Sequence, residues 1–473
     1  MDVVTVPRLR GSHALAGMAA VVVCGLIAVL GSEPVAARRA QAGLERPDIV
    51  MVVLDDVVAG SMPRLLARLP SMRERFVETG IRFTSAIGET PMCCPGRAGL
   101  LTGQHTHNHG VFRNNASRFD PTVTLATVLD DRGYYTALAG KYFNRMFGLK
   151  DKTPPGWDHI AGFSGGYYEY LMWVDGVAEG HHSLESDHSV DVSTGHAVDF
   201  IEQAPADQPL FLWFSPYAVH GEDGWYPKPA PRHIDDPRCD GVANWKPPNY
   251  AESDLSDKPA WIRARGPMGF FPTGWPMEPM CDTLLSVDEG FAAIEDALAP
   301  RGRLDDTIWV LVADNGMTYG QHSLTGKLVP YATPIPLYVS WPAGRGETQR
   351  TEDLLVSNID IAPTLAALAG ATMPDADGLD WSPLLRDQPV DLGRGEVLES
   401  LPETLASQPD LPAWWGIRTA DKRWHYIEWS TGERELYDLT SDPWELTSRD
   451  RDSAYARYIP GLSARLHALM PDG

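Results

Sequence analysis

Residues 49–56 read IVMVVLDD, an uninterrupted apolar run that ends in two adjacent aspartates. The run is rich in β-branched side chains, which favour extended backbone. A continuous apolar run of this length predicts a strand that is covered on both faces, as in a parallel or mixed sheet flanked by helices. The two aspartates then stand at the carboxyl end of a buried strand.

Two later segments have the same pattern of a buried strand followed by polar residues. Residues 210–214 read LFLWF and lead on to His220, and residues 308–312 read IWVLV and lead to Asp314 and Asn315. Ligands in open α/β sheets bind at the carboxyl ends of the strands. Three strands that end in this way therefore predict one shared site.

The intervening sequence predicts an α/β fold with a large mixed, mostly parallel sheet flanked by helices. Helical apolar spacing is found at 123–129, 284–298 and 359–369. Residues 221–280 are rich in Pro, Trp and Gly and have little periodicity. A loop of that length in a compact domain is usually functional or disordered, and its aromatic residues favour a packed loop over the cleft.

The pattern changes after about residue 385. Short strands separated by turns are expected at 414–419, 424–429 and 435–439, followed by a helix near 455–469. We therefore expect a first domain over residues 46–385 and a C-terminal subdomain with a small antiparallel sheet over residues 386–473.

The first residues of the chain predict export. Arg8 and Arg10 precede an apolar run over 14–30, and small residues at 35–37 offer a cleavage site, which is typical of a secretory leader over residues 1–37. The run is just short of a confident membrane span, so an uncleaved N-terminal anchor stays open. We expect an exported protein that is secreted, periplasmic or held at the cell surface.

Charge and cysteine content narrow the function further. The formal net charge of −23 argues against a nucleic-acid partner, because phosphate binding needs a basic face. Outside the leader the cysteines are Cys93, Cys94, Cys239 and Cys281. In an oxidising compartment Cys239 and Cys281 could pair across the loop between them, although sequence alone does not choose among the pairings.

Oxygen ligands and cations accumulate at the predicted strand ends. Hard oxygen ligands are offered by Asp55, Asp56, Asp314 and Asn315, and such a set suits Ca²⁺ or Mg²⁺ and does not suit zinc. Cations near the same strand ends or in glycine-rich turns are Arg97, Lys141, His220 and Lys327. Taken singly, each is explained as a turn, cap or surface residue. Together they could hold a tetrahedral oxyanion beside a divalent cation.

Residues 91–103 read PMCCPGRAGLLTG. Pro95 suits an early helical position, which puts Cys93 at a helix N-terminus, where free N–H groups and the helix dipole favour an anion. A thiolate there would be a nucleophile. However, the chain has no Cys-x-x-Cys pair, and a soft thiolate matches poorly with a hard-cation site.

The run Cys93-Cys94-Pro95-Gly96-Arg97 resembles the C-x-P-x-R signature of the sulfatases, in which the cysteine is oxidised to formylglycine. The spacing selects Cys93, because Cys94 has no proline two residues later. The resemblance extends over about residues 46–450. Segments that resemble the branch acting on glucosamine 6-sulfate in glycosaminoglycans are 107–109, 140–144, 154–157, 256–259 and 284–288.

The resemblance implies a sulfuric ester hydrolase that removes sulfate from a sulfated sugar. It implies Ca²⁺, with Mg²⁺ as the alternative, held by Asp55, Asp56, the formylglycine at Cys93, Asp314 and Asn315. The implied catalytic residues are Cys93 as formylglycine, Arg97, Lys141 and Lys327 around the sulfate, and His220 as the acid that protonates the leaving sugar oxygen.

The resemblance also implies a sulfated carbohydrate as the substrate and a formylglycine-generating enzyme as a partner in maturation. Many arylsulfatases have a histidine two residues after the lysine, where Phe143 stands here. The proton acceptor for sulfate release is therefore open, with Asn144 or a metal-ligating aspartate as candidates.

Two other functions fit the same residues. The first is a phosphate or phosphonate monoester hydrolase, because both esters present a tetrahedral oxyanion to the same modified cysteine and cation. The second is a non-catalytic anion- or glycan-binding relative, with Cys93 left as a thiol or in a disulfide. The complete set of metal and cation residues argues against the second.

Overall fold

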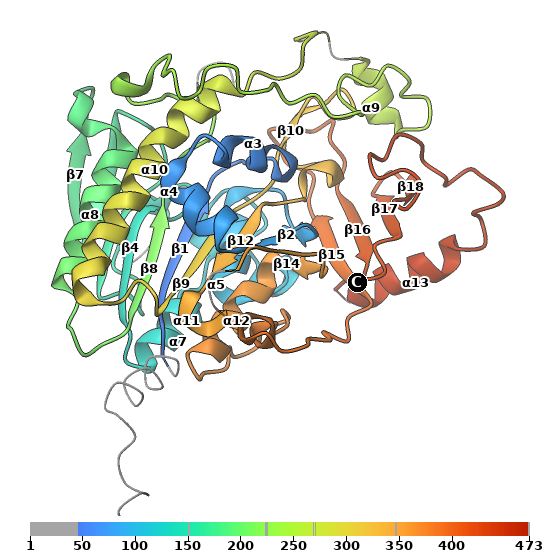
Figure 1. The fold of residues 1–473 in the computed structure, drawn as a ribbon. Coiled ribbons are helices and arrows are strands. Elements are labelled where there is room, and N and C mark those ends of the chain that lie inside the picture. The colour runs from blue at the N-terminus through green and yellow to red at the C-terminus, as the bar shows by residue number, and fades with distance from the viewer. Residues whose placement is uncertain are drawn as a thin grey trace, which may run out of the picture. The chain divides into compact units, whose positions relative to one another are not determined.

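A ten-stranded mixed sheet organises the fold (Figure 1). The computed structural model describes residues 46–149, 152–222, 226–267, 269, 271–345 and 348–471, and the expected leader over 1–37 lies outside them. From one edge of the sheet to the other, the strands are β13 (Arg350–Glu352), β2 (Ile81–Phe83), β12 (Leu337–Ser340), β9 (Thr307–Ala313), β1 (Asp48–Leu54), β8 (Leu210–Ser215), β4 (Tyr135–Lys141), β5 (His159–Phe163), β6 (Tyr170–Val174) and β7 (Val177–His181).

The centre of this sheet is parallel and buried on both faces. Strands β9, β1, β8, β4 and β5 run parallel, whereas β12, β6 and β7 pair antiparallel with their neighbours. Alternate residues of β1 enter two different core clusters: Val50, Val52 and Leu54 one, Ile49, Met51 and Val53 the other. The continuous apolar run is therefore explained by cover on both sides.

Helices form these two covers (Figure 1). Apolar side chains of α8 (Ser189–Gln203) and α10 (Glu278–Leu298) share the first cluster, and those of α5 (Cys93–Thr102), α7 (Leu125–Asp131) and α12 (Ile361–Leu368) share the second. The expected α/β fold is confirmed. Shorter elements are α3 (Met62–Leu66), α4 (Pro70–Arg73), β3 (Ala86–Ile87), α6 (Thr106–His109), α9 (Ala260–Arg265), β10 (Thr318–Tyr319), β11 (Thr325–Gly326), α11 (Pro342–Arg345) and β14 (Val356–Ser357).

A second, four-stranded antiparallel sheet lies toward the C-terminus, as expected. Its strands in order are β15 (Glu396–Leu401), β16 (Trp414–Thr419), β17 (Trp424–Trp429) and β18 (Arg434–Asp438), and α13 (Ile459–Leu469) packs on it. Sequence patterning missed β15. Its Glu399 is fully buried and pairs with Arg418 at 2.6 Å, so this strand lacks the apolar pattern of a buried strand. The domain boundary at residue 385 stays a prediction.

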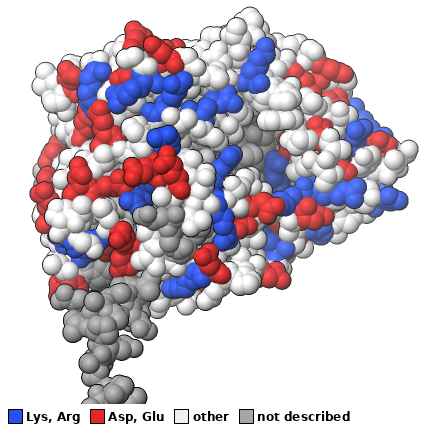
Figure 2. Space-filling model, viewed as in Figure 1, with Lys and Arg blue, Asp and Glu red and all other residues white. Residues whose placement is uncertain are grey.

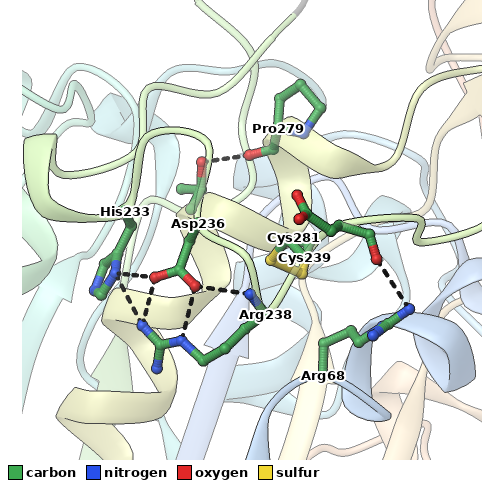
Figure 3. The surroundings of a disulfide bond; sticks show 9 residues. Arg68, His233, Asp236, Arg238, Cys239, Pro279 and Cys281 are labelled. Atoms are coloured by element: carbon green, nitrogen blue, oxygen red, sulfur yellow. Dashed lines mark hydrogen bonds and ion pairs between the residues drawn. A yellow bond between two sulfur atoms is a disulfide. The ribbon is translucent and has the colours of Figure 1, made fainter.

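A disulfide ties the long loop over 221–277 to α10 (Figure 3). Cys239 in the loop pairs with Cys281 in the helix, which confirms the pairing that the sequence left open. The loop is packed, because Trp245 and Trp275 are buried and exchange two backbone hydrogen bonds of 2.8 and 2.9 Å. The expectation of a packed loop is therefore correct.

Two surface properties bear on the environment of the protein. On the face seen in Figure 2, acidic and basic side chains are interspersed. Among the residues that the structure describes, each helix is too short or too polar to cross a bilayer.

Reduction of the disulfide is expected to destabilise the fold. The bond closes a loop with a sequence separation of 42 residues. A cross-link of that length restricts the unfolded chain, so its loss should lower the free energy of unfolding by about 2–4 kcal/mol. Urea unfolding with and without dithiothreitol measures this difference. The double variant Cys239→Ala/Cys281→Ala should unfold at the same urea concentration as the reduced wild type, and dithiothreitol should not change that concentration. Equal wild-type midpoints with and without dithiothreitol would contradict the prediction.

Candidate active site

The register of the central strands brings two aspartates side by side. Strands β1 and β9 pair in parallel with Leu54 opposite Ala313, so Asp55 and Asp314 leave the sheet at neighbouring positions. The backbone N–H of Asp314 donates to the carbonyl of Leu54 at 3.0 Å, which continues the ladder to the strand ends. Both carboxylates are completely buried.

Four side chains converge at this edge of the sheet. One ligand atom each from Asp55, Asp56, Cys93 and Asp314 lies within 4.8 Å of the others. Asn315 joins them, because its amide nitrogen donates to Asp56 Oδ1 at 2.7 Å. The structure therefore brings together all the residues that the sequence analysis proposed as metal ligands.

Two buried oxygens in this cluster test whether a cation fits. Asp314 Oδ1 and Asn315 Oδ1 have no hydrogen-bond donor among the described residues. A buried polar oxygen without a partner is energetically unfavourable and calls for a ligand. Carboxylate and amide oxygens are the ligands that Ca²⁺ and Mg²⁺ prefer. The residues present therefore fit a hard divalent cation.

Arg97 is buried between the two strand ends. Its guanidinium contacts Asp314 Oδ2 at 2.8 Å and Asp55 Oδ2 at 3.2 Å. Its Nη1 also donates to the carbonyl of Lys141 at 2.6 Å and to Ser215 Oγ at 2.7 Å. One side chain on α5 thus makes hydrogen bonds or ion pairs with residues at the ends of four strands, β1, β9, β4 and β8.

Two lysines complete the charge balance. Lys141 ends β4 and its Nζ pairs with Asp55, whereas Lys327 Nζ lies 2.5 Å from Asp56 Oδ1 and 2.9 Å from Cys93 Sγ. Burial would by itself raise the pKa of Asp55, but the charges of Lys141, His220 and Arg97 hold that pKa well below its usual range. Burial, with the adjacent charge of Asp55, raises the pKa of Asp314.

Cys93 is the first residue of α5 and is completely buried. Its Sγ lies 3.6 Å from Asp55 Oδ1. Burial, and then the charge of Asp55, raises the pKa of the Cys93 thiol well above its usual range. The neighbouring Cys94 faces away toward Asn144, whose Oδ1 lies 3.6 Å from Cys94 Sγ.

His220 approaches the cluster from the segment after β8. Its Nε2 lies 3.5 Å from Asp56 Oδ2, and its Nδ1 lies 2.7 Å from both the Tyr217 hydroxyl and the carbonyl of Gly221. The Tyr217 ring stacks on the imidazole with centroids 4.6 Å apart. Sequence analysis missed Tyr217 and Ser215, although both stand between a predicted strand end and His220.

Gly96 is required by the close approach of α5 to β9. A Cβ at this position would lie 1.9 Å from the carbonyl oxygen of Asp314, a backbone atom that cannot move independently. The variable position between Pro95 and Arg97 is therefore restricted to glycine in this protein by packing.

A pocket of about 740 Å³ opens onto the cluster at Asp56, His220 and Lys327. Its walls come from distant segments, which are residues 113–115, Arg145, 221–222, Arg265, 317–318, 324–329, 405–408 and Leu411. Sequence analysis expected the loop over 221–280 at the cleft, but missed the contributions of 113–115 and 405–411. These irregular segments have no periodic pattern that would assign them to a site.

Comparison with known proteins identifies the class to which this fold and site belong. The family model described as Sulfatase matches residues 47–371, and a second model, described as N-sulphoglucosamine sulphohydrolase, C-terminal, matches residues 320–472. The chain belongs to the sulfatase family and is an enzyme of that family. The resemblance of its Cys93–Arg97 run is thus confirmed at the level of the family.

Individual relatives are similar over most of the chain. N-acetylglucosamine-6-sulfatase of Capra hircus is 27% identical over 86% of this chain and 80% of its own length. An extracellular sulfatase SULF-1 homolog of Drosophila melanogaster is 31% identical over 72% of this chain, which spans only 31% of that longer relative. A solved structure described as in complex with its substrate D-glucosamine-2-N,6-O-disulfate shares the fold, with a TM-score of 0.73, 22% identity and coverage of 89% of this chain and 97% of that one.

The variant Gly96→Ala is expected to displace α5 from β9. Because the added Cβ meets backbone, the free energy of unfolding should fall by about 1–3 kcal/mol, as measured by urea unfolding. The matched control is Gly195→Ala in α8, where a Cβ meets nothing within 4 Å. That control should leave stability unchanged or raise it by up to about 1 kcal/mol. Equal stability of the two variants would show that the close approach is not rigid.

Removal of divalent cations is expected to lower the thermal stability of the protein, and calcium is expected to restore it. After treatment with EDTA, addition of Ca²⁺ should raise the melting temperature, because the cation binds the folded state only. Asp56→Asn should weaken calcium binding, measured by calorimetry, at least about tenfold. The control is Asp282→Asn, which changes another buried aspartate with an unpartnered oxygen outside the cluster. A calcium affinity that is equal in the wild type and the Asp56 variant would place the ion elsewhere.

Proposed function

We propose that this enzyme hydrolyses the sulfate ester of a glucosamine 6-sulfate-like sugar, and that it does so outside the cytoplasm. The observation that carries the proposal is the buried cluster around Cys93. In this cluster Asp314 Oδ1 and Asn315 Oδ1 have no hydrogen-bond donor among the described residues, and Lys327 and His220 face the pocket. The similarity to N-acetylglucosamine-6-sulfatase supports the choice of sugar. The disulfide supports an oxidising compartment.

Two groups complete the proposed site. Asp55, Asp56, Asp314 and Asn315 would hold Ca²⁺, with Mg²⁺ as the alternative, and the cation when bound polarises sulfuryl oxygens and lowers the pKa of a nearby hydroxyl. Cys93 would be converted by a formylglycine-generating enzyme, and the hydrated aldehyde supplies a nucleophilic hydroxyl together with a second hydroxyl that allows sulfate to be released. The position of Cys93 at the start of α5, beside Asp55 and Lys327, supports this assignment.

The chain's own cations would then bind and orient the sulfate. Lys141 and Lys327 lie beside Asp55, Asp56 and Cys93, where they would neutralise charge on the transferring group. Arg97 has no donor directed to the open pocket, since its contacts are with Asp55, Asp314, Ser215 and the Lys141 carbonyl. We therefore assign it the positioning of both carboxylates.

His220 would protonate the departing sugar oxygen. Its Nδ1 lies within hydrogen-bond distance of the Gly221 carbonyl, which can only accept, so Nδ1 carries a proton. The proton that is exchanged with substrate is therefore on Nε2, which faces Asp56 at the edge of the pocket.

The mass of the tryptic peptide 83–97 tests the modification. Protein made together with a formylglycine-generating enzyme should yield a peptide about 18 Da lighter at Cys93, because CH₂SH is replaced by CHO. Cys94→Ala should keep this loss and Cys93→Ala should abolish it.

The same preparation should hydrolyse N-acetylglucosamine 6-sulfate and prefer 4-nitrophenyl sulfate to 4-nitrophenyl phosphate. Dominant phosphate turnover would favour the phosphoester alternative, and full activity with an intact Cys93 thiol would exclude the proposed chemistry.

The variant His220→Ala is expected to separate substrates by their leaving groups. A sugar alkoxide needs a proton to depart, so kcat for N-acetylglucosamine 6-sulfate should fall about 10²–10⁴-fold. A nitrophenolate departs without one, so kcat for 4-nitrophenyl sulfate should fall much less. Tyr217→Phe serves as the comparison, because it keeps the ring that stacks on His220 and removes the hydroxyl. An equal loss on both substrates would show that His220 is not the acid.

A further inference from the structure

The pocket contains arginines that the proposed reaction does not use. Besides Lys327 and His220 at its floor, the pocket is lined by Arg113, Arg145 and Arg265. They come from three separate segments of the chain, which are the loop after α6, the turn after β4 and the last residue of α9. Cations from unrelated segments that meet in one pocket indicate a common anionic ligand.

Two of these arginines have no ion-pair partner among the residues that the structure describes. Arg113 is neutralised by Glu403 at 2.6 Å. Within the described ranges, neither Arg145 nor Arg265 has a carboxylate oxygen within the 4.0 Å of an ion pair. The acidic residues that line the pocket are already paired, Glu222 with Lys228 at 3.1 Å and Asp56 with Lys327 at 2.5 Å.

Both arginines are exposed, and a local feature of each restricts either its backbone or its side chain. Arg145 has a positive φ of 57°, which is uncommon for a residue other than glycine, and it directly precedes the turn Met146–Gly148. The guanidinium of Arg265 lies 5.1 Å from the ring centroid of Trp261, and Trp261 packs against Trp429 of the second sheet at 5.3 Å. A guanidinium that is already stacked on a ring loses less conformational entropy when it binds a ligand, which favours recognition of an anion.

The scissile sulfate does not account for these arginines, because Lys141 and Lys327 already stand beside Cys93. In a chain with a net charge of −23, an anionic substrate is repelled unless local cations oppose the overall field. A pocket of about 740 Å³ lies in the range that accommodates ligands well above the size of a single sulfate group.

We propose that Arg145 and Arg265 bind a second anionic group of the substrate, a sulfate or a carboxylate, and thereby select doubly charged sugars over singly charged ones. This inference rests on the proposed function, since it takes the scissile sulfate to lie beside Lys327. A guanidinium pairs in bidentate fashion with both groups, so the shared chemistry is a planar or tetrahedral oxyanion. The second charge can stand on the sulfated sugar or on a neighbouring uronic acid.

Kinetics with three substrates test the proposal. They are N-acetylglucosamine 6-sulfate, glucosamine 2-N,6-O-disulfate, and a disaccharide of 6-sulfated N-acetylglucosamine with a uronic acid. The variants are Arg145→Asn, chosen because asparagine tolerates positive φ, Arg265→Gln, and the two combined. The control is Arg386→Gln, whose arginine lies 5.5 Å from a tryptophan ring but outside the pocket lining.

The double variant should raise KM at least about tenfold for one or both doubly charged substrates and keep kcat, because a charge-assisted contact is lost in the bound state. KM for the singly charged sugar should stay within about twofold, as it should for the Arg386 control on all substrates. Whether the disulfate or the uronic acid substrate responds identifies the second anion.

A double variant that changes KM for all three substrates equally, or for none, overturns the proposal. Competitive inhibition of 4-nitrophenyl sulfate hydrolysis by the same sugars gives the comparison for any sugar that is bound and not cleaved. This comparison distinguishes failure of the glucosamine assignment from failure of the arginine site. If only the glucosamine assignment is wrong, no sugar is cleaved, but the doubly charged sugars still inhibit the wild type more strongly than they inhibit the double variant.

Discussion

The buried contact of Arg97 with Asp55 and Asp314 is the interaction on which the rest of the site depends. Burial of several carboxylates at the end of a sheet is unfavourable unless each is paired. Arg97 pairs with two of them and also donates to Ser215 and to the Lys141 carbonyl. Loss of one partner from such a buried set typically destabilises a protein by about 3–5 kcal/mol, because an uncompensated charge is left inside.

The same contact sets the position of Cys93. Arg97 follows Cys93 by about one helical turn in α5. Because Arg97 donates to Asp314 at the end of β9, the start of the helix is held close to that strand. Gly96 permits this approach, since its missing Cβ leaves room for the Asp314 carbonyl. The thiol that the proposed chemistry modifies is thus brought 3.6 Å from Asp55 and 2.9 Å from Lys327.

The second sheet completes the pocket rather than the cluster. Trp414 of β16 donates its indole N–H to the carbonyl of Leu328 at 2.8 Å, directly after Lys327. Leu328 has a positive φ of 80°, so this loop is held in an uncommon conformation by contacts with the second sheet. Residues 405–408 and Leu411, between β15 and β16, form one wall of the pocket. The shape of the pocket is therefore set by both sheets, whereas the buried charges belong to the first.

Patterning along the chain was sufficient for the central strands, because a strand covered on both faces must be apolar throughout and can carry charge only where it ends. Asp55, Asp314 and His220 were recognisable for that reason, and the Cys93–Arg97 run pointed to the family. Patterning does not show that Asp55 and Asp314 are neighbours, because strand order and register decide this and no local pattern encodes them.

Strand β15 is not recognisable from the sequence, because its buried Glu399 is paired with residues of other strands. These partners are Arg418 and His425. The roles of Tyr217, Arg145, Arg265 and the pocket wall at 405–408 and Leu411 could be recognised only in the folded chain. These irregular segments have no periodicity, and they meet in space through long-range packing.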